Sequence, residues 1–161
     1  MPLREITTRA MPHGARNHSG FLVTINTNRK AQTAAERDVI ADIMRSIIHE
    51  MWRDQNVPRM VKFLTGPRDP RLIKAVDSEF AIEVGGHQGR VHAHVLTNIY
   101  HNSRIHLDAT YIRDEVTDQL NEGLIGAGMA PLRGKVYVNI KSIKGDWSVL
   151  RYVRKTGTRV I

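Results

Sequence analysis

The sequence contains no cysteine, so neither a disulfide bond nor a thiolate metal site can form within it. It lacks a GxxxxGKS or GxxxxGKT phosphate loop, which excludes a P-loop ATPase or helicase from these 161 residues. No apolar run approaches the roughly 18 residues of a membrane helix. Residues 1–19 are polar and basic, without the apolar core of a signal peptide. We therefore expect a protein that is neither membrane-bound nor secreted.

Size and charge place the chain in a broad class. A chain of 161 residues, 41% of them hydrophobic, is long enough for one domain with its own core. Lys and Arg outnumber Asp and Glu by 24 to 16, which gives a net charge of +8. This excess favours a polyanionic partner such as nucleic acid. A generically basic protein without such a partner is the alternative.

The stretch EVGGHQGRVHAH, residues 83–94, carries an acid and two histidines at spacings that strands can bring together. Because side chains alternate across a strand, His92 and His94 point to one face of RVHAHVLTN. The preceding EFAIEVGG also alternates, and the glycine-rich turn predicts an antiparallel hairpin with Glu83 beside the histidines. One carboxylate and two neutral imidazoles suit a divalent ion with open positions. A chance pair of surface histidines is the alternative.

A tyrosine and a lysine near the C-terminus form a second group. DWSVLRYVRKTG predicts a short helix with Asp146 as its N-cap and Gly157 just past its end. Tyr152 and Lys155 lie three residues apart and therefore on one helix face. A phenol with a pKa of about 10 is a poor nucleophile unless a cation and a metal-polarised electrophile assist it. Lys155 can supply the cation, although ordinary amphipathic helices carry such pairs too.

Three motifs in order resemble those of HUH-type replication initiators. GFLVTINTN, residues 20–28, resembles the first motif, a strand that ends in Thr, an apolar residue and Asn. HAH, residues 92–94, matches the second motif, and residues 152–155 match the third, YxxK. Glu83 stands where an upstream acid completes the metal site in the Rep proteins of circular single-stranded DNA viruses. The resemblance extends over most of the chain.

Two departures place the chain in the wider family rather than in one branch. The interval between His94 and Tyr152 is longer than in compact viral members, which implies an additional helix or hairpin. The first motif lacks the proline or second adjacent Asn that many viral members have. A Rep domain of a eukaryotic virus, a parvovirus-like initiator and a Rep-related transposon protein all remain open.

The resemblance implies metal-dependent, sequence-specific nicking and joining of single-stranded DNA at a replication origin, which starts rolling-circle replication. Glu83, His92 and His94 would hold Mg²⁺ or Mn²⁺, and Tyr152 would form a 5′-phosphotyrosine link with Lys155 assisting. The implied partners are single-stranded DNA or an origin hairpin, and a helicase domain in a longer parent protein. The implied location is the host nucleus for a eukaryotic virus or transposon, and the cytoplasm otherwise.

Several polar and basic side chains are candidates for DNA contacts. Residues 1–19 predict a flexible basic arm, which either reaches a DNA backbone or has no role. Thr24 and Asn26 on the first predicted strand either contact DNA bases or have a structural role at the end of the strand. The loop GPRDPRLIK, for which a solvated loop is the alternative, and the C-terminal helix supply the remaining candidates: Arg68, Arg71, Lys74 and Arg154.

Other tyrosines and histidines are weaker candidates. Three tyrosines are not followed by lysine three positions later and are interpreted as structural: Tyr100, Tyr111 and Tyr137. Three histidines are spare ligand candidates, with a solvated turn as the alternative for the first: His87, His101 and His106.

The remaining segments predict the scaffold. Thr33 and Glu36 form a capping-box pattern before apolar positions at helical spacing, so a helix of about twenty residues follows the first strand. A second helix, capped by Asp108 and ending near Gly123, precedes a loop and a last strand, KVYVNIKSI. Side chains alternate along that strand, and either of the two alternating sets can face outward. The order predicts an α+β sandwich with a mainly antiparallel sheet flanked by helices. The resemblance implies a ferredoxin-like or RRM-like version of it over residues 20–161.

Two other function classes fit parts of the sequence. A non-catalytic RRM-like nucleic-acid-binding domain explains the charge and the element order. However, only 6% of the residues are aromatic, too few for a paired stacking platform. A metal-dependent phosphoesterase that uses water needs the metal ligands but not Tyr152. A covalent DNA adduct separates both classes from a tyrosine nickase.

Overall fold

The computed structural model describes residues 17–31, 33–52, 64–65, 71, 73–85, 89–102, 105–143 and 158–160. In chain order, the elements of this part are β1 (Asn17–Lys30), α2 (Ala34–Trp52), β2 (Leu64–Thr65), β3 (Ile73–Gly85), β4 (Arg90–His101), β5 (His106–Leu107), α4 (Ala109–Gly126), β6 (Tyr137–Ile143) and β7 (Thr158–Val160).

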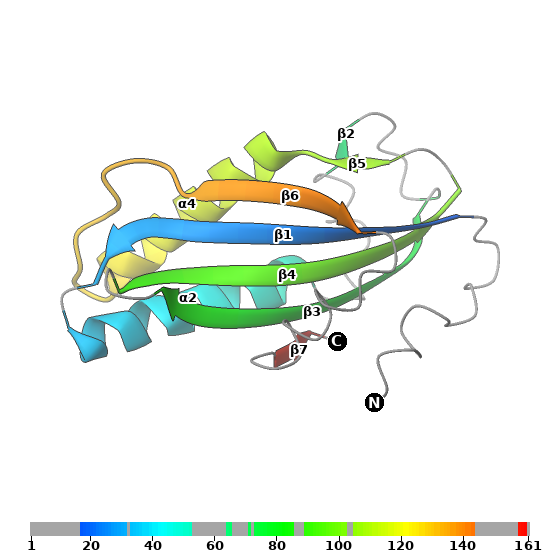
Figure 1. The fold of residues 1–161 in the computed structure, drawn as a ribbon. Coiled ribbons are helices and arrows are strands. Elements are labelled where there is room, and N and C mark those ends of the chain that lie inside the picture. Colours follow the sequence, from blue (N-terminus) through cyan, green and yellow to red (C-terminus); the bar gives the residue numbers. More distant parts are fainter. Residues whose placement is uncertain are drawn as a thin grey trace.

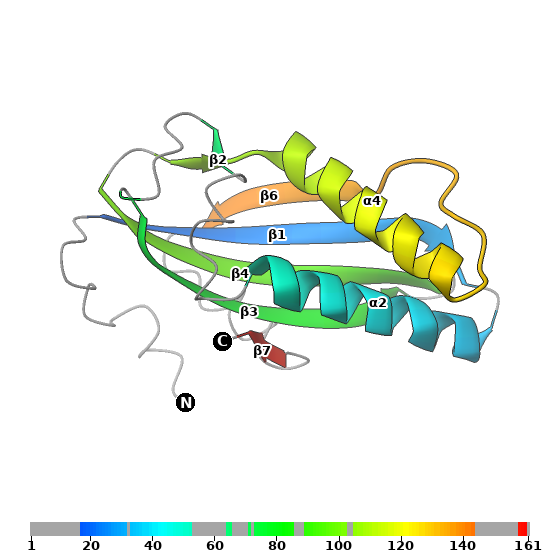
Figure 2. The ribbon, with the colours of Figure 1, turned by 180° about the vertical axis from the view of Figure 1, so that it is seen from behind.

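Five strands form one antiparallel sheet in the order β6-β1-β4-β3-β7, while β2 pairs with β5 separately. Figure 1 views the sheet with α2 and α4 behind it, and Figure 2 shows both helices in front. Both described helices therefore lie on one face, and we call the opposite face the outer face. The predicted α+β class is confirmed, in a form compatible with a ferredoxin-like arrangement.

Helix length and hydropathy also bear on a membrane role. Neither of the two described helices combines the length and the apolar character needed to cross a membrane.

The core lies between the sheet and the two helices. The central strands turn alternate apolar side chains inward, and these are buried: Phe21, Val23 and Ile25 on β1, and Val91, Ala93 and Val95 on β4. The buried stripe of α2 follows the predicted helical spacing: Ile40, Met44, Ile47, Ile48, Met51 and Trp52. Because inward and outward side chains alternate, the intervening strand residues project from the outer face.

Both helices begin at side-chain caps that the sequence predicts. The backbone N–H of Glu36 donates to Thr33 Oγ1 at 3.1 Å, and that of Tyr111 donates to Asp108 Oδ1 at 3.1 Å. The Glu36 carboxylate also accepts from the guanidinium of Arg29 on β1, at 3.2 Å. This ion pair connects the end of β1 to the start of α2.

The first strand starts earlier than predicted. Residues 17–19 were assigned to the flexible arm by their polarity, but they belong to β1 and pair with the last residues of β4. The arm prediction is wrong for these three residues because polar partners are available on β4. His18 Nε2 lies 2.8 Å from Asn98 Oδ1, for example. Residues 1–16 of the expected arm lie outside the described part.

The second half of the chain departs from prediction in two places. α4 continues past Gly123 to Gly126, because Gly123 serves as a close contact against Ile43 of α2 rather than as a helix end. β7 pairs with β3 and has no counterpart in the sequence prediction. The helix predicted over residues 146–157 lies outside the described residues.

Candidate metal centre

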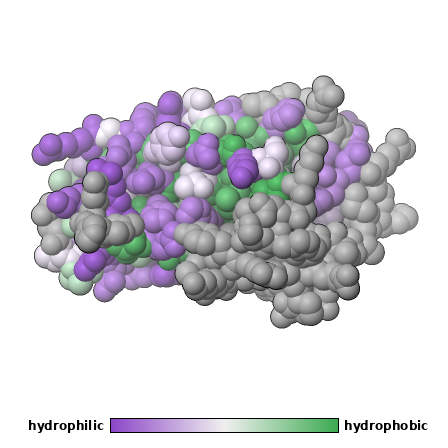
Figure 3. All heavy atoms as spheres, in the orientation of Figure 1, coloured by the Kyte–Doolittle hydropathy of each residue, from purple (hydrophilic) through white to green (hydrophobic). Residues whose placement is uncertain are grey.

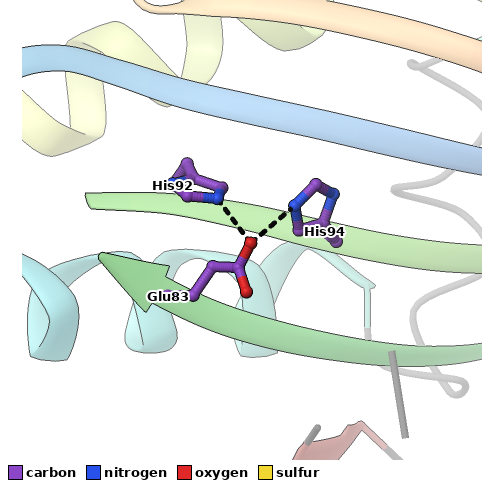
Figure 4. A group of neighbouring side chains, drawn as sticks. All are labelled: Glu83, His92 and His94. Atoms are coloured by element: carbon purple, nitrogen blue, oxygen red, sulfur yellow. Dashed lines mark hydrogen bonds and ion pairs between the residues drawn. The ribbon is translucent and has the colours of Figure 1, made fainter. Parts of the chain in front are cut away.

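The β3–β4 hairpin brings the predicted acid and histidines together on the outer face. Glu83 pairs directly with His92 in the strand register, as the alternation and the glycine-rich turn predict. Glu83 Oε1 lies 2.6 Å from His92 Nε2 and 3.2 Å from His94 Nε2. The two rings are nearly perpendicular, with centroids 5.2 Å apart. Figure 4 shows both Nε2 atoms turned toward the same carboxylate oxygen.

The spacing and chemistry of these three side chains fit a divalent metal ion. One ligand atom from each of Glu83, His92 and His94 lies within 4.8 Å of the others. Ligands at right angles around an ion at 2.1 Å would lie about 3 Å apart, close to the two Oε1–Nε2 distances. The exposed fractions of the side chains are 25%, 18% and 15% respectively, so solvent can reach the cluster. The cluster can therefore hold an ion that keeps open positions.

The second nitrogen of each ring has its own partner. His92 Nδ1 lies 3.4 Å from the carbonyl oxygen of Arg90, and His94 Nδ1 lies 3.2 Å from Thr24 Oγ1. The tautomer with its proton on Nδ1 lets each histidine donate to that oxygen and keeps the Nε2 lone pair for a metal ion. In the other tautomer, Nε2–H donates to the Glu83 carboxylate. Metal-binding histidines are generally held in the first way. Thr24 is thus a positioning residue for His94.

The charge state of His94 also suits a metal ligand. Burial lowers the pKa of His94, and the neighbouring His92 lowers it further, while Glu83 acts in the opposite direction. The lowered pKa favours the neutral imidazole at neutral pH. Only the neutral ring offers a lone pair to a metal ion.

Asn26, the other predicted candidate on β1, shapes the backbone. It pairs with His92 across the sheet, and the strand register shifts immediately after it. Its Oδ1 accepts from the backbone N–H of Asn28 at 2.8 Å, and Asn28 has a φ of 55°. Asparagine is one of the few residue types with a side chain that adopts this left-handed conformation. The hydrogen bond from Asn28 to Asn26 supports a local bend that ends the regular part of β1.

Two straight rows of residues cross the outer face. The first row contains Tyr137, Asn26, His92 and Glu83, and the second contains Asn139, Thr24, His94 and Ala81. The structure therefore selects one of the two sets that the sequence left open for β6: Tyr137, Asn139 and Lys141 project outward. The sequence left the side of Tyr137 open, and the structure places it, 63% exposed, in the row of Glu83 and His92.

The two described candidates of the basic loop lie far from the cluster. Arg71 and Lys74 are exposed, and Lys74 Nζ donates to the carbonyl oxygen of Arg71 at 2.8 Å. Lys74 lies at the start of β3 and Glu83 near its end, so about 30 Å of strand separates them. Four other candidates lie outside the described residues: Arg68, Tyr152, Arg154 and Lys155.

The spare candidates do not join the cluster where they are described. His101 is buried, and its Nε2 lies 2.9 Å from Ser19 Oγ. His106 is exposed on β5, and His87 lies outside the described residues. Tyr100 is buried, in agreement with a structural role.

Comparisons with protein-family models, curated proteins and solved structures give no match to this chain. The case for its function therefore rests on the side chains themselves.

Proposed function

We propose that this chain nicks and rejoins single-stranded DNA at a replication origin, by the tyrosine chemistry of the HUH-type initiators that its motifs resemble. The observation that carries the proposal is the convergence of Glu83, His92 and His94 on an accessible sheet face, with Thr24 bonded to His94. Residues of the first and second motifs, 70 positions apart, thus meet in one cluster. The net charge of +8 supports a polyanionic substrate.

The three ligands define what the metal centre would contribute. Glu83, His92 and His94 would hold Mn²⁺ or Mg²⁺; two imidazoles favour Mn²⁺ in affinity, and abundance favours Mg²⁺. When bound, such an ion polarises the scissile phosphate and offsets the negative charge of the transition state. The cluster lies on two paired strands, so its geometry is fixed before the DNA arrives.

Tyr152 is the proposed nucleophile, on the strength of its sequence motif. Its phenol loses a proton, and the oxygen attacks phosphorus in line with the 3′-oxygen. A bond forms between the tyrosine oxygen and the 5′-phosphate, the bond to the 3′-oxygen breaks, and that oxygen takes up a proton. Lys155 would steady the phosphate or assist loss of the phenolic proton. One phosphodiester replaces another, so the step is nearly balanced in energy and runs backwards as strand joining.

A second candidate function uses the same ligands without the tyrosine. Water reaches the partly exposed side chains of Glu83, His92 and His94, which favours a phosphoesterase that hydrolyses the phosphodiester directly. The non-catalytic nucleic-acid-binding domain is the third candidate, and it gives no reason for the metal-ligand cluster.

The test is incubation with a pool of random single-stranded oligonucleotides and Mn²⁺, followed by a denaturing gel and mass spectrometry. We expect a covalent DNA adduct on Tyr152 that disappears with a chelator, and sequencing of the trapped DNA would give the recognised motif. Cleavage without an adduct would replace the proposal with the water-using phosphoesterase. Binding without cleavage would replace it with the binding domain.

A further inference from the structure

A cavity of about 510 Å³ lies at the end of the sheet where β1 finishes and β4 begins. Its walls come from residues 27–30, Glu36 of α2, the first residue of β4 and the segment 130–135 between α4 and β6. Arg90 lines the cavity, and His92 follows two positions later on the same face of β4. The backbone of Arg90 therefore lies roughly 7 Å along β4 from that of His92, a candidate metal ligand. Figure 3 shows hydrophilic side chains gathered on this half of the outer face.

The cavity is strongly cationic. Its charged lining consists of five cations and one carboxylate: Arg29, Lys30, Arg90, Arg133, Lys135 and Glu36. Two of the cations already have partners within the protein. Arg29 donates to Glu36 and to the carbonyl oxygen of Ala130, and Lys135 lies 3.2 Å from the Asp114 carboxylate. These contacts hold the walls together and leave three positive charges for a ligand.

Those three charges have no partner in the described part of the chain. No ion pair or side-chain hydrogen bond joins Lys30, Arg90 or Arg133 to another described residue. Nε of Arg90 is buried and has no acceptor there. A buried N–H group without an acceptor costs free energy, and buried donors normally have a partner. A ligand acceptor that enters the cavity and bonds to Nε of Arg90 would remove this free-energy cost.

The bend in β1 brings the cationic residues to the cavity. The strand register shifts between Asn26 and Lys30, and Asn28, with its φ of 55°, lies in the cavity wall. Asn26 supports this bend through its hydrogen bond to Asn28, while it pairs with His92 on the other side. One short segment therefore connects the metal centre to the cavity.

We propose that this cavity binds a phosphate group of the single-stranded DNA whose neighbouring phosphate lies at the metal centre. Guanidinium groups bind phosphate oxygens through paired N–H donors, and lysine adds a point charge. The spacing of Arg90 and His92 along β4 is one that a single extended nucleotide bridges. The phosphate chemistry follows from the cavity alone, and DNA as its bearer rests on the proposed function.

The test measures binding of a fluorescent single-stranded oligonucleotide by anisotropy, with chelator present, over a series of salt concentrations. The variants are Lys30→Ala and Arg133→Ala, both at exposed positions. Arg45→Ala is the matched control, since it removes one exposed positive charge from α2 on the other side of the sheet. Circular dichroism checks that all three fold.

Each cavity variant should weaken binding on the order of threefold to tenfold and lower the slope of log affinity against log salt by about 0.7–1. Arg45→Ala should leave both values unchanged. Slopes of the cavity variants equal to that of Arg45→Ala would overturn the proposal.

A competition arm separates DNA from a free nucleotide. Inorganic phosphate and a deoxynucleoside 5′-monophosphate should compete with the oligonucleotide only weakly. If the mononucleotide binds more tightly than the oligonucleotide and loses affinity in Arg133→Ala, the cavity is a nucleotide site and the DNA assignment is wrong.

This assay is independent of nicking, because the chelator removes the metal ion. DNA binding that depends on Lys30 and Arg133, without any adduct in Mn²⁺, would refute the proposed function and leave the cavity assigned to phosphate. Adduct formation with unchanged salt slopes would refute the cavity and leave the proposed function.

Discussion

The hydroxyl of Thr24 lies 3.2 Å from Nδ1 of His94, and the two residues face each other directly on the neighbouring strands β1 and β4. The contact leaves Nε2 of His94 to face Glu83. Thr24 belongs to the first sequence motif and His94 to the second. Their pairing would give the first motif a role in the proposed metal centre, to which it supplies no ligand.

Replacing Thr24 by Val tests this positioning role. Valine keeps the β-branched shape but removes the oxygen that holds Nδ1, so the affinity for Mn²⁺ should fall about 10–100-fold. Thr24→Ser retains the hydroxyl and should bind nearly as well as the wild type. Calorimetric titration with Mn²⁺ measures both. Equal affinity in Thr24→Val and the wild type would remove Thr24 from the metal centre.

Metal binding should also stabilise the fold. With free Mn²⁺ at 100 times Kd, the wild type should gain about 2.7 kcal/mol, or roughly 5–10 °C in Tm. His92→Ala and His94→Ala each remove one of three ligands, so the same Mn²⁺ concentration should leave their Tm nearly unchanged. Thermal denaturation with Mn²⁺ and with chelator measures the gain. A gain that survives without either imidazole would place the ion elsewhere.

The nucleophile can be tested against a matched tyrosine. Tyr152→Phe should abolish adduct formation and leave DNA binding nearly intact, because only the phenolic oxygen is lost. Tyr137→Phe is the control, since Tyr137 is 63% exposed in the row of the metal ligands and is the competing hydroxyl there. It should retain the adduct. If Tyr137→Phe abolished the adduct and Tyr152→Phe retained it, the nucleophile would be Tyr137 on β6.

Two glycines of α4 should respond to alanine with opposite signs. A Cβ at Gly123 would lie 2.7 Å from Ile43 Cγ2, so the overpacking cost of about 1–3 kcal/mol should exceed the helix-propensity gain of about 1 kcal/mol. A Cβ at Gly126 meets nothing within 4 Å, so Gly126→Ala should stabilise by up to about 1 kcal/mol. Denaturant unfolding measures both. Stabilisation by both substitutions would mean that α2 shifts to make room for the added Cβ beside Ile43.

Much of the site was predictable because its rules are local. Alternation along the strands and the glycine-rich turn predicted Glu83 beside His92, and the strand register confirms it. Asp108 was predictable as a cap for the same reason: the cap and its N–H partner, on Tyr111, are three residues apart.

The features that were missed depend on contacts between distant segments. Nothing local to Thr24 indicates that β1 pairs with β4, so its contact with His94 could not be derived from spacing. The outward set of β6 depends on pairing with β1 in the same way. The cationic cavity draws on four separate segments, namely residues 27–30, Glu36, Arg90 and residues 130–135, and no local sequence pattern connects them.

The rows across the outer face also determine which changes in chain length the protein can tolerate. Glu83, His92 and Thr24 stand on three adjacent strands, and each reaches the cluster only because its strand is in the correct register. One inserted or deleted residue within these strands would turn the side chains beyond it to the helix-covered face. Strand register does not limit the length of the connection between α4 and β6, but residues 130–135 of it line the cationic cavity. Homologous chains should therefore keep these three strands free of insertions and place changes in length outside both the strands and this segment.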